Sequence, residues 1–342
     1  MSFAFVLFLS YAALAGIALV FALAPSTREV FVKYGRTRDK PETAAKGTQT
    51  SGARAGRSTT LAAALHLCAS WTVPKNLFTQ FYCVGAIISG LLTIDTIAWC
   101  NSQATPELSG ADQRFFGHRY LLFEQWLFGR SSQSRVPIAD PSRLAVLSLV
   151  LFTIHVLIRL KECVYDQPLT DARMHIGQYA VGIVFYVVTP LAVVADSYYP
   201  PGWGLQLSWT VPVGIAIFIY ASIHQWRCHQ ILYGLRRRGL DAKSTGPDSA
   251  STSQGSSARL DSYAIPTGDL FKYVSCPHFL CEILIYISIW LASACQATTL
   301  LWVIGWTAIN LGITARESQQ WYRARFGARY PRDRRALVPF VW

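Results

Sequence analysis

The stretch LAVLSLVLFTIHVLIRLK, residues 144–161, is apolar for most of its length and ends in Arg159 and Lys161. A helix needs about 20 mostly apolar residues to cross a bilayer, because lipid offers no partners to its backbone polar groups. Basic side chains at the end of such a helix favour the cytosolic side of the membrane. The stretch therefore predicts a membrane-spanning helix whose C-terminal end faces the cytosol.

Six further stretches have a similar length and composition. They cover residues 3–24, 77–98, 176–197, 207–224, 277–295 and 298–315. Of the 342 residues, 52% are hydrophobic and only 15% are charged, whereas soluble domains have about 25% charged residues. The sequence therefore predicts an all-α integral membrane protein with about seven transmembrane helices. We interpret the first stretch as an uncleaved helix, because no basic residue precedes it.

The basic residues are concentrated on one side of this predicted bundle. If the N-terminus is lumenal, the cytosolic loops are 25–76, 160–175, 225–275 and 316–342. They carry 9, 2, 7 and 7 Lys and Arg residues, whereas the opposite loops carry 4. The positive-inside rule accounts for this bias and for the net charge of +12 without nucleic acid as a partner. It also places the C-terminus in the cytosol.

Two polar segments interrupt the apolar pattern, at 36–60 and at 239–260. Both are poor in large apolar residues and cannot bury a core. They divide the chain into four predicted parts. These are an N-terminal helix with a basic flexible linker (1–70), the central helices (71–238), a disordered cytosolic insert (239–260) and a C-terminal region with the last two helices and a basic tail (261–342).

Polar side chains gather at the cytosolic ends of the predicted helices, where each is costly and suggests a function. They include His155, Arg159, Glu162, His175, Gln178, Tyr179, His224, Gln225, Arg227, His229, Arg236–Arg238, His278 and Glu282. His278 and Glu282 are four residues apart and share a helix face. Guanidinium groups suit phosphates because they donate paired hydrogen bonds. The pattern therefore indicates a phosphate-bearing ligand.

Two other kinds of site are not expected. The chain has no GxGxxG after a strand, so any dinucleotide binds between membrane helices and not in a Rossmann domain. The HQWRCH segment (224–229) lacks further ligands at metal-binding spacing, so we expect no metal. The 8 cysteines are scattered without CxxC pairs, which is typical of reduced thiols.

Four segments carry a resemblance to a known family. YAIPTGDLFKYVSCPHFLCEILIY (263–286) and WYRARFGARYPRDRRALVPFVW (321–342) resemble the C-terminal domain of the steroid 5-alpha-reductase family. VPKNLFTQFY (73–82) and HQWRCHQILYGLRR (224–237) look like its polyprenol (polyprenal) reductase branch. The similarity covers roughly residues 71–342, apart from the inserts.

This resemblance implies an NADPH-dependent oxidoreductase that acts on a CH–CH group in the endoplasmic reticulum membrane. The implied reaction saturates the alpha-isoprene double bond of a polyprenoid lipid, overall from polyprenol to dolichol, and thereby supports protein N-glycosylation. NADPH would bind near the cytosolic side. Carried over by position, its contacts fall on Gln225, His229, Arg236, Tyr263, His278, Glu282, Arg316 and Tyr322.

The chain departs from the steroid-reducing members of the family. Their ketone-holding Tyr falls on Val156 here, their Glu cannot be placed near Lys75, and a His three residues before the tail Tyr is replaced by Gln319. We therefore expect a polyprenal, whose conjugated aldehyde accepts hydride at its beta carbon. A group must then hydrogen-bond the aldehyde oxygen or supply a proton. The candidates are Lys75, His155, His175 and Tyr179.

Several alternatives remain open from the sequence. The same C-terminal pattern would suit a reductase of an enoyl thioester or a steroid enone. A membrane methyltransferase acting on a prenylated group has a similar size and cytosolic polar tail. A transporter is less favoured, because no repeat of helix pairs is evident. The oligomeric state is not indicated.

Overall fold

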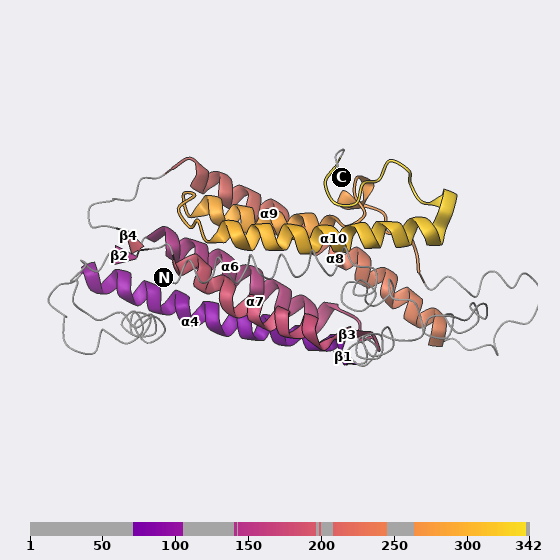
Figure 1. Ribbon diagram of the computed structural model, residues 1–342, viewed down its shortest axis with the longest axis horizontal. Helices are drawn as coiled ribbons and strands as arrows, with labels where there is room; N and C mark the ends of the chain where they lie inside the picture. The colour runs from indigo at the N-terminus through magenta and orange to yellow at the C-terminus, as the bar shows by residue number, and fades with distance from the viewer. Residues whose placement is uncertain are drawn as a thin grey trace, which may run out of the picture.

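The computed structural model describes residues 71–104, 140–141, 143–195, 198–199, 208–244 and 263–339. In these ranges the chain is mostly helical, and the long helices lie side by side in an elongated bundle (Figure 1). The predicted helix at 3–24, the linker at 36–60 and the insert from 245 onward lie outside the described residues.

Three helices form one half of the bundle. They are α4 (Phe78–Ala104), α6 (Arg143–Lys161) and α7 (Ile176–Ala195), and each is long and apolar enough to cross a membrane. They confirm the helices predicted at 77–98, 144–161 and 176–197. Gly85 of α4 allows close packing, because a Cβ atom there would lie 2.9 Å from Tyr186 Cδ1 and 3.2 Å from Val156 Cγ1.

The other half consists of α8 (Thr210–Ser244), α9 (Pro277–Ala292) and α10 (Leu300–Phe326), with α9 packed against both neighbours. Helix α9 is apolar but has only 16 residues. The predicted ends of two helices were wrong. The helix predicted at 207–224 continues to Ser244, so residues 239–244 are helical and not part of a disordered insert. The helix predicted at 298–315 continues to Phe326.

These two helices extend beyond their apolar segments because one face of each extension is buried. His229 and Tyr233 are buried on α8, and Glu317 and Tyr322 are buried on α10. Packing of such a face stabilises a helix after its hydropathy has fallen. Hydropathy alone therefore located the apolar segments but not the helix ends.

Short strand pairs, which were not predicted, close the two ends of the bundle. Strand β1 (Thr72–Pro74) pairs antiparallel with β3 (Arg173–His175), and β2 (Asp140–Pro141) pairs antiparallel with β4 (Tyr198–Tyr199). The β1–β3 pair lies at the end where α6 finishes and α7 begins (Figure 1). There, the π-helical turn η6 (Glu162–Asp166) continues α6.

The C-terminal tail folds back onto the segment before α9, which contains the short helix η9 (Asp269–Lys272). After the short helix η10 (Gly327–Arg329), Arg335 N donates to Tyr273 O at 3.1 Å, and Ser275 N donates to Arg335 O at 2.8 Å. Arg334 is only 4% exposed and donates to Pro266 O at 3.1 Å. The tail is therefore a packed part of the fold.

The α8–α9 contact predicts a stability difference between two glycines of one helix. A Cβ atom at Gly214 would lie 2.7 Å from the backbone atoms Ser288 O and Ala292 N, whereas one at Gly234 would meet nothing within 4 Å. Gly214→Ala should therefore cost about 1–3 kcal/mol through overpacking. Gly234→Ala should gain up to about 1 kcal/mol in helix propensity. Thermal unfolding in detergent checks this, and equal midpoints for the two variants would contradict the packing.

Candidate functional site

Three helices contribute to a buried carboxylate at the polar end of the bundle. Glu282 of α9 places Oε1 3.2 Å from His155 Nε2 of α6 and Oε2 2.5 Å from Gln225 Nε2 of α8. Gln225 Nε2 also donates to the backbone oxygen of His278 at 3.3 Å. The Gln225 amide and the His155 ring can both donate to Glu282, so the carboxylate holds α6, α8 and α9 in one arrangement.

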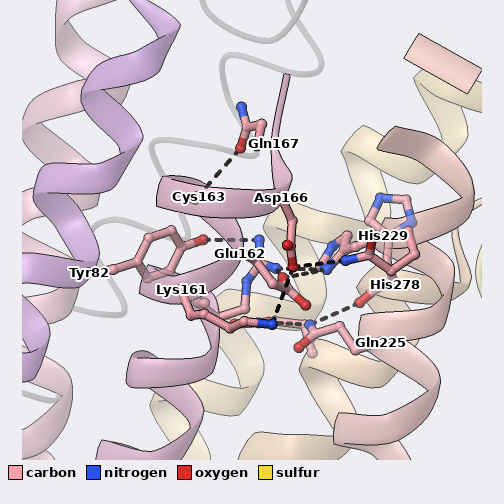
Figure 2. Close-up of polar contacts among 12 residues, drawn as sticks. Tyr82, Lys161, Glu162, Cys163, Asp166, Gln167, Gln225, His229 and His278 are labelled. Carbon is pink, nitrogen blue, oxygen red and sulfur yellow. Dashed lines mark hydrogen bonds and ion pairs between the residues drawn. The ribbon is translucent and has the colours of Figure 1, made fainter. Parts of the chain in front are cut away.

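A second buried carboxylate lies one turn further along α6. Glu162, which is 1% exposed, forms an ion pair with Arg159, and its Oε2 is 3.0 Å from His229 Nδ1 of α8. Arg159 Nη1 is 2.7 Å from the same Nδ1, and its Nη2 is 3.4 Å from the hydroxyl of Tyr82 on α4. Figure 2 shows Glu162 and His229 directed toward each other, with Tyr82 on the opposite side.

These two carboxylates and their partners form one site, here called the polar cluster. Its members are His155, Arg159, Glu162, Gln225, His229, His278 and Glu282. The rings of His229 and His278 are 5.4 Å apart, which joins the two parts. The cluster therefore combines two acids, one fixed cation, three imidazoles and an amide in a largely buried setting.

The protonation state of His229 follows from its neighbours. Burial lowers the pKa of its imidazole well below the ordinary value, and the positive charge of Arg159 lowers it further. A guanidinium can only donate hydrogen bonds, so Nδ1 accepts from Arg159 and the ring proton lies on Nε2. His229 is therefore a neutral donor at neutral pH.

This neutral His229 predicts a loss of stability in mild acid. The folded chain leaves His229 unprotonated, whereas the unfolded chain binds a proton below about pH 6.5. The free energy of unfolding should therefore fall as pH drops through 6.5, by up to about 1.4 kcal/mol per pH unit from this residue. Thermal unfolding between pH 5 and 7 should show a shallower slope in His229→Gln than in the wild type. Equal slopes would contradict the assignment.

Two acidic residues fasten short helical turns to α8. Asp269 Oδ1 of η9 is 2.7 Å from His224 Nδ1, and its Oδ2 is 3.8 Å from Arg227 Nη1. In η6, Asp166 Oδ2 accepts from Gln230 Nε2 at 2.9 Å. These contacts fix the segments that lead into α9 and out of α6, and thus the approach to the polar cluster.

The structure brings together five of the twelve residues selected from the sequence, namely His155, Gln225, His229, His278 and Glu282. Arg236 is half-buried further along α8, and its charge also acts on His229. Tyr322 stacks on Tyr330 with ring centroids 5.5 Å apart. Tyr263 packs edge-on against Trp321, whereas Arg316 is exposed on α10.

The other three candidates lie around the β1–β3 pair. Lys75 follows β1, and its backbone N donates to Ala172 O at 2.8 Å. His175 ends β3, and its Nδ1 accepts from Gly177 N at 3.0 Å. The Tyr179 hydroxyl donates to Gln80 Oε1. These three residues therefore have local contacts at the start of α4 and α7.

Sequence reasoning missed two residues. Tyr82 lay within the VPKNLFTQFY segment, but its partner Arg159 is 77 positions away. Arg334 lay in a run of basic residues that is typical of an exposed tail. The expected pairing of Glu162 with Arg159 is confirmed. In the described ranges, no group of three or more His, Cys, Asp or Glu side chains could hold a metal ion.

Comparisons with known proteins give a consistent result. Residues 253–342 match the 3-oxo-5-alpha-steroid 4-dehydrogenase family. The chain is 30% identical over 306 residues to polyprenal reductase 2 of Oryza sativa subsp. japonica, with 80% of each chain covered. It is 30% identical over 290 residues to the polyprenal reductase of Mus musculus, with 81% of each chain covered. The human polyprenal reductase is 29% identical over 286 residues, with 80% of each chain covered.

Proposed function

Because this chain belongs to the steroid 5-alpha-reductase family, we propose that it reduces the alpha-isoprene double bond of a polyprenal with NADPH. The product is the corresponding dolichal, on the way from polyprenol to dolichol for protein N-glycosylation. The observation that carries the proposal is the 30% identity over 80% of the chain with a polyprenal reductase. The polar cluster supports it, because it offers a buried polar site beside apolar helices.

The residues of the site fit a phosphorylated dinucleotide. Glu162 has a buried carboxylate oxygen, Oε1, and Arg334 has a buried Nε, and neither atom has a hydrogen-bond partner among the described residues. A ribose hydroxyl can donate to such an oxygen, and a phosphate can accept from a guanidinium. We propose that the cofactor is held by Gln225, His229, Arg236, Tyr263, His278, Glu282, Arg316 and Tyr322. NADPH, when bound, supplies the hydride.

The protein's own residues orient the substrate and exclude water. We propose that Glu282 fixes the His155 ring, whose Nε2 it faces at 3.2 Å, so that His155 borders the reacting head group. Lys75, His175 and Tyr179 lie at the end of the bundle from which water can reach the site. They remain our candidates for supplying the proton that the alpha carbon takes up. The polyprenyl tail needs only the apolar helix faces.

The same proposal extends to the membrane arrangement. We propose seven transmembrane helices in the endoplasmic reticulum membrane, with the N-terminus lumenal and the C-terminus cytosolic. Three apolar helices among the described residues and the bias of basic residues toward one side support this topology. The polar cluster would then lie on the cytosolic side, where NADPH is available.

The decisive experiment uses membranes that contain the full-length protein. They are incubated with polyprenal and deuterated NADPH, and the lipids are analysed by mass spectrometry. Dolichal carrying one deuterium is expected, and membranes without the protein serve as the control. A failure to consume polyprenal would overturn the substrate assignment. Parallel incubations with a steroid enone and a trans-2-enoyl thioester test the alternatives within the family. Binding of S-adenosylmethionine in place of NADPH would indicate a methyltransferase.

A further inference from the structure

We propose that Tyr82 donates the hydrogen bond that stabilises the substrate's aldehyde oxygen during reduction. The inference rests on the proposed function and names a catalytic residue for it. It starts from the position of Tyr82 in the described bundle. This tyrosine lies on α4, and its hydroxyl is 3.4 Å from Arg159 Nη2 of the polar cluster.

Helix packing places this hydroxyl where it is. At Gly85 the absence of a side chain lets α4 approach Val156 of α6 and Tyr186 of α7. One turn away on each of the antiparallel helices α4 and α6, Tyr82 and Arg159 face each other, with the guanidinium carbon 5.3 Å from the ring centroid. Val156 is fully buried in this packing. The nearest hydroxyl to the cluster on this side therefore comes from α4.

The contact with Arg159 determines what the hydroxyl can do. A guanidinium has no acceptor, so the Tyr82 oxygen must accept and its own proton is directed elsewhere. A hydrogen bond accepted from a cation polarises the O–H group and makes it a stronger donor. Tyr82 is half-buried, so its side chain is not sealed within the core. By contrast, Tyr179 already donates its proton to Gln80.

The reaction requires such a donor. When hydride adds to the beta carbon of the enal, the electron pair of the double bond moves into the carbonyl system, and negative charge grows on the aldehyde oxygen. A donor placed at that oxygen stabilises the charge. Tyr82 keeps its proton throughout, and the alpha carbon takes its proton from water. The substrate thus gains one hydride and one proton.

The first test is Tyr82→Phe in the full-length protein, assayed with polyprenal and NADPH. The ring that contacts Arg159 and Tyr186 is retained, and only the hydroxyl is lost. We expect kcat to fall about 100- to 1,000-fold, as for loss of one oxyanion donor, with KM for polyprenal and Kd for NADPH unchanged. Tyr165→Phe is the control, because Tyr165 is 76% exposed. A raised KM with unchanged kcat would assign Tyr82 to binding alone and overturn the proposal.

The second test reads the hydrogen bond directly. Infrared difference spectra are recorded for polyprenal labelled with carbon-13 at its aldehyde, bound with NADP⁺. The carbonyl stretch should be lowered by the wild type and by Tyr165→Phe, and should return toward its free value in Tyr82→Phe. If Tyr82→Phe fails to fold, 3,5-difluorotyrosine at position 82 replaces it, and this stronger donor should lower the stretch further. An unchanged stretch would overturn the proposal. A wild type that cannot reduce polyprenal would instead overturn the proposed function.

Discussion

Glu282→Leu is expected to weaken NADPH binding by roughly 30- to 5,000-fold and to reduce polyprenal turnover accordingly. The carboxylate receives contacts from His155 and Gln225 at 3.2 and 2.5 Å. Its removal leaves both groups without their acceptor, so the shape and charge of the site change together. Truncating one partner of a buried, hydrogen-bonded charged group costs about 2–5 kcal/mol, which corresponds to this range of affinities.

The measurement is NADPH binding by fluorescence, together with the mass-spectrometric assay of product lipid. Asp241→Asn is the control, because it also removes one carboxylate from the polar side of the bundle but from an exposed position on α8. It should bind and turn over like the wild type. An unchanged NADPH affinity in Glu282→Leu would exclude Glu282 from the cofactor site. A transporter or scaffold function predicts that outcome together with no product lipid in any variant.

Glu162→Leu should have the largest effect on stability, a loss of about 3–5 kcal/mol. Glu162 is buried, and its ion-pair partner Arg159 is buried as well. Loss of one partner leaves an uncompensated charge in a medium that solvates it poorly. Thermal unfolding in detergent measures the loss. Lys161→Met is the matched control, since the neighbouring pair of Lys161 with Asp166 is exposed and longer, at 3.7 Å, and should contribute less than about 1 kcal/mol.

The double variant Arg159→Met/Glu162→Leu separates stability from function. Replacing both charges with apolar side chains of similar size should restore most of the stability, because no unpaired charge remains. Activity should stay low, because Tyr82 and His229 lose their contacts with Arg159. A double variant as unstable as Glu162→Leu would show that the cost arises from packing and not from charge. A loss below 1 kcal/mol in the single variant would contradict the buried ion pair.

Part of the candidate site could be predicted from local sequence. His278 and Glu282 are one turn apart, and Arg159 and Glu162 are three residues apart, so their proximity follows from helix geometry. The resemblance to a known family added Gln225 and His229 on α8. The contacts of Tyr82 with Arg159, and of Arg334 with Pro266, could not be predicted in this way. They join residues 77 and 68 positions apart, and only the packing of elements brings them together.

The sequence by itself determined where the apolar helices lie, on which side the basic residues gather and to which family the C-terminal motifs are similar. These properties are local, because hydropathy, charge and short motifs are carried by neighbouring residues. Only the tertiary structure decided how far α8 and α10 extend, how the tail folds back and which hydroxyl faces the polar cluster. Those outcomes depend on which faces are buried between helices, and the close approach of α4 to α6 at Gly85 is the physical reason that residues 82 and 159 meet.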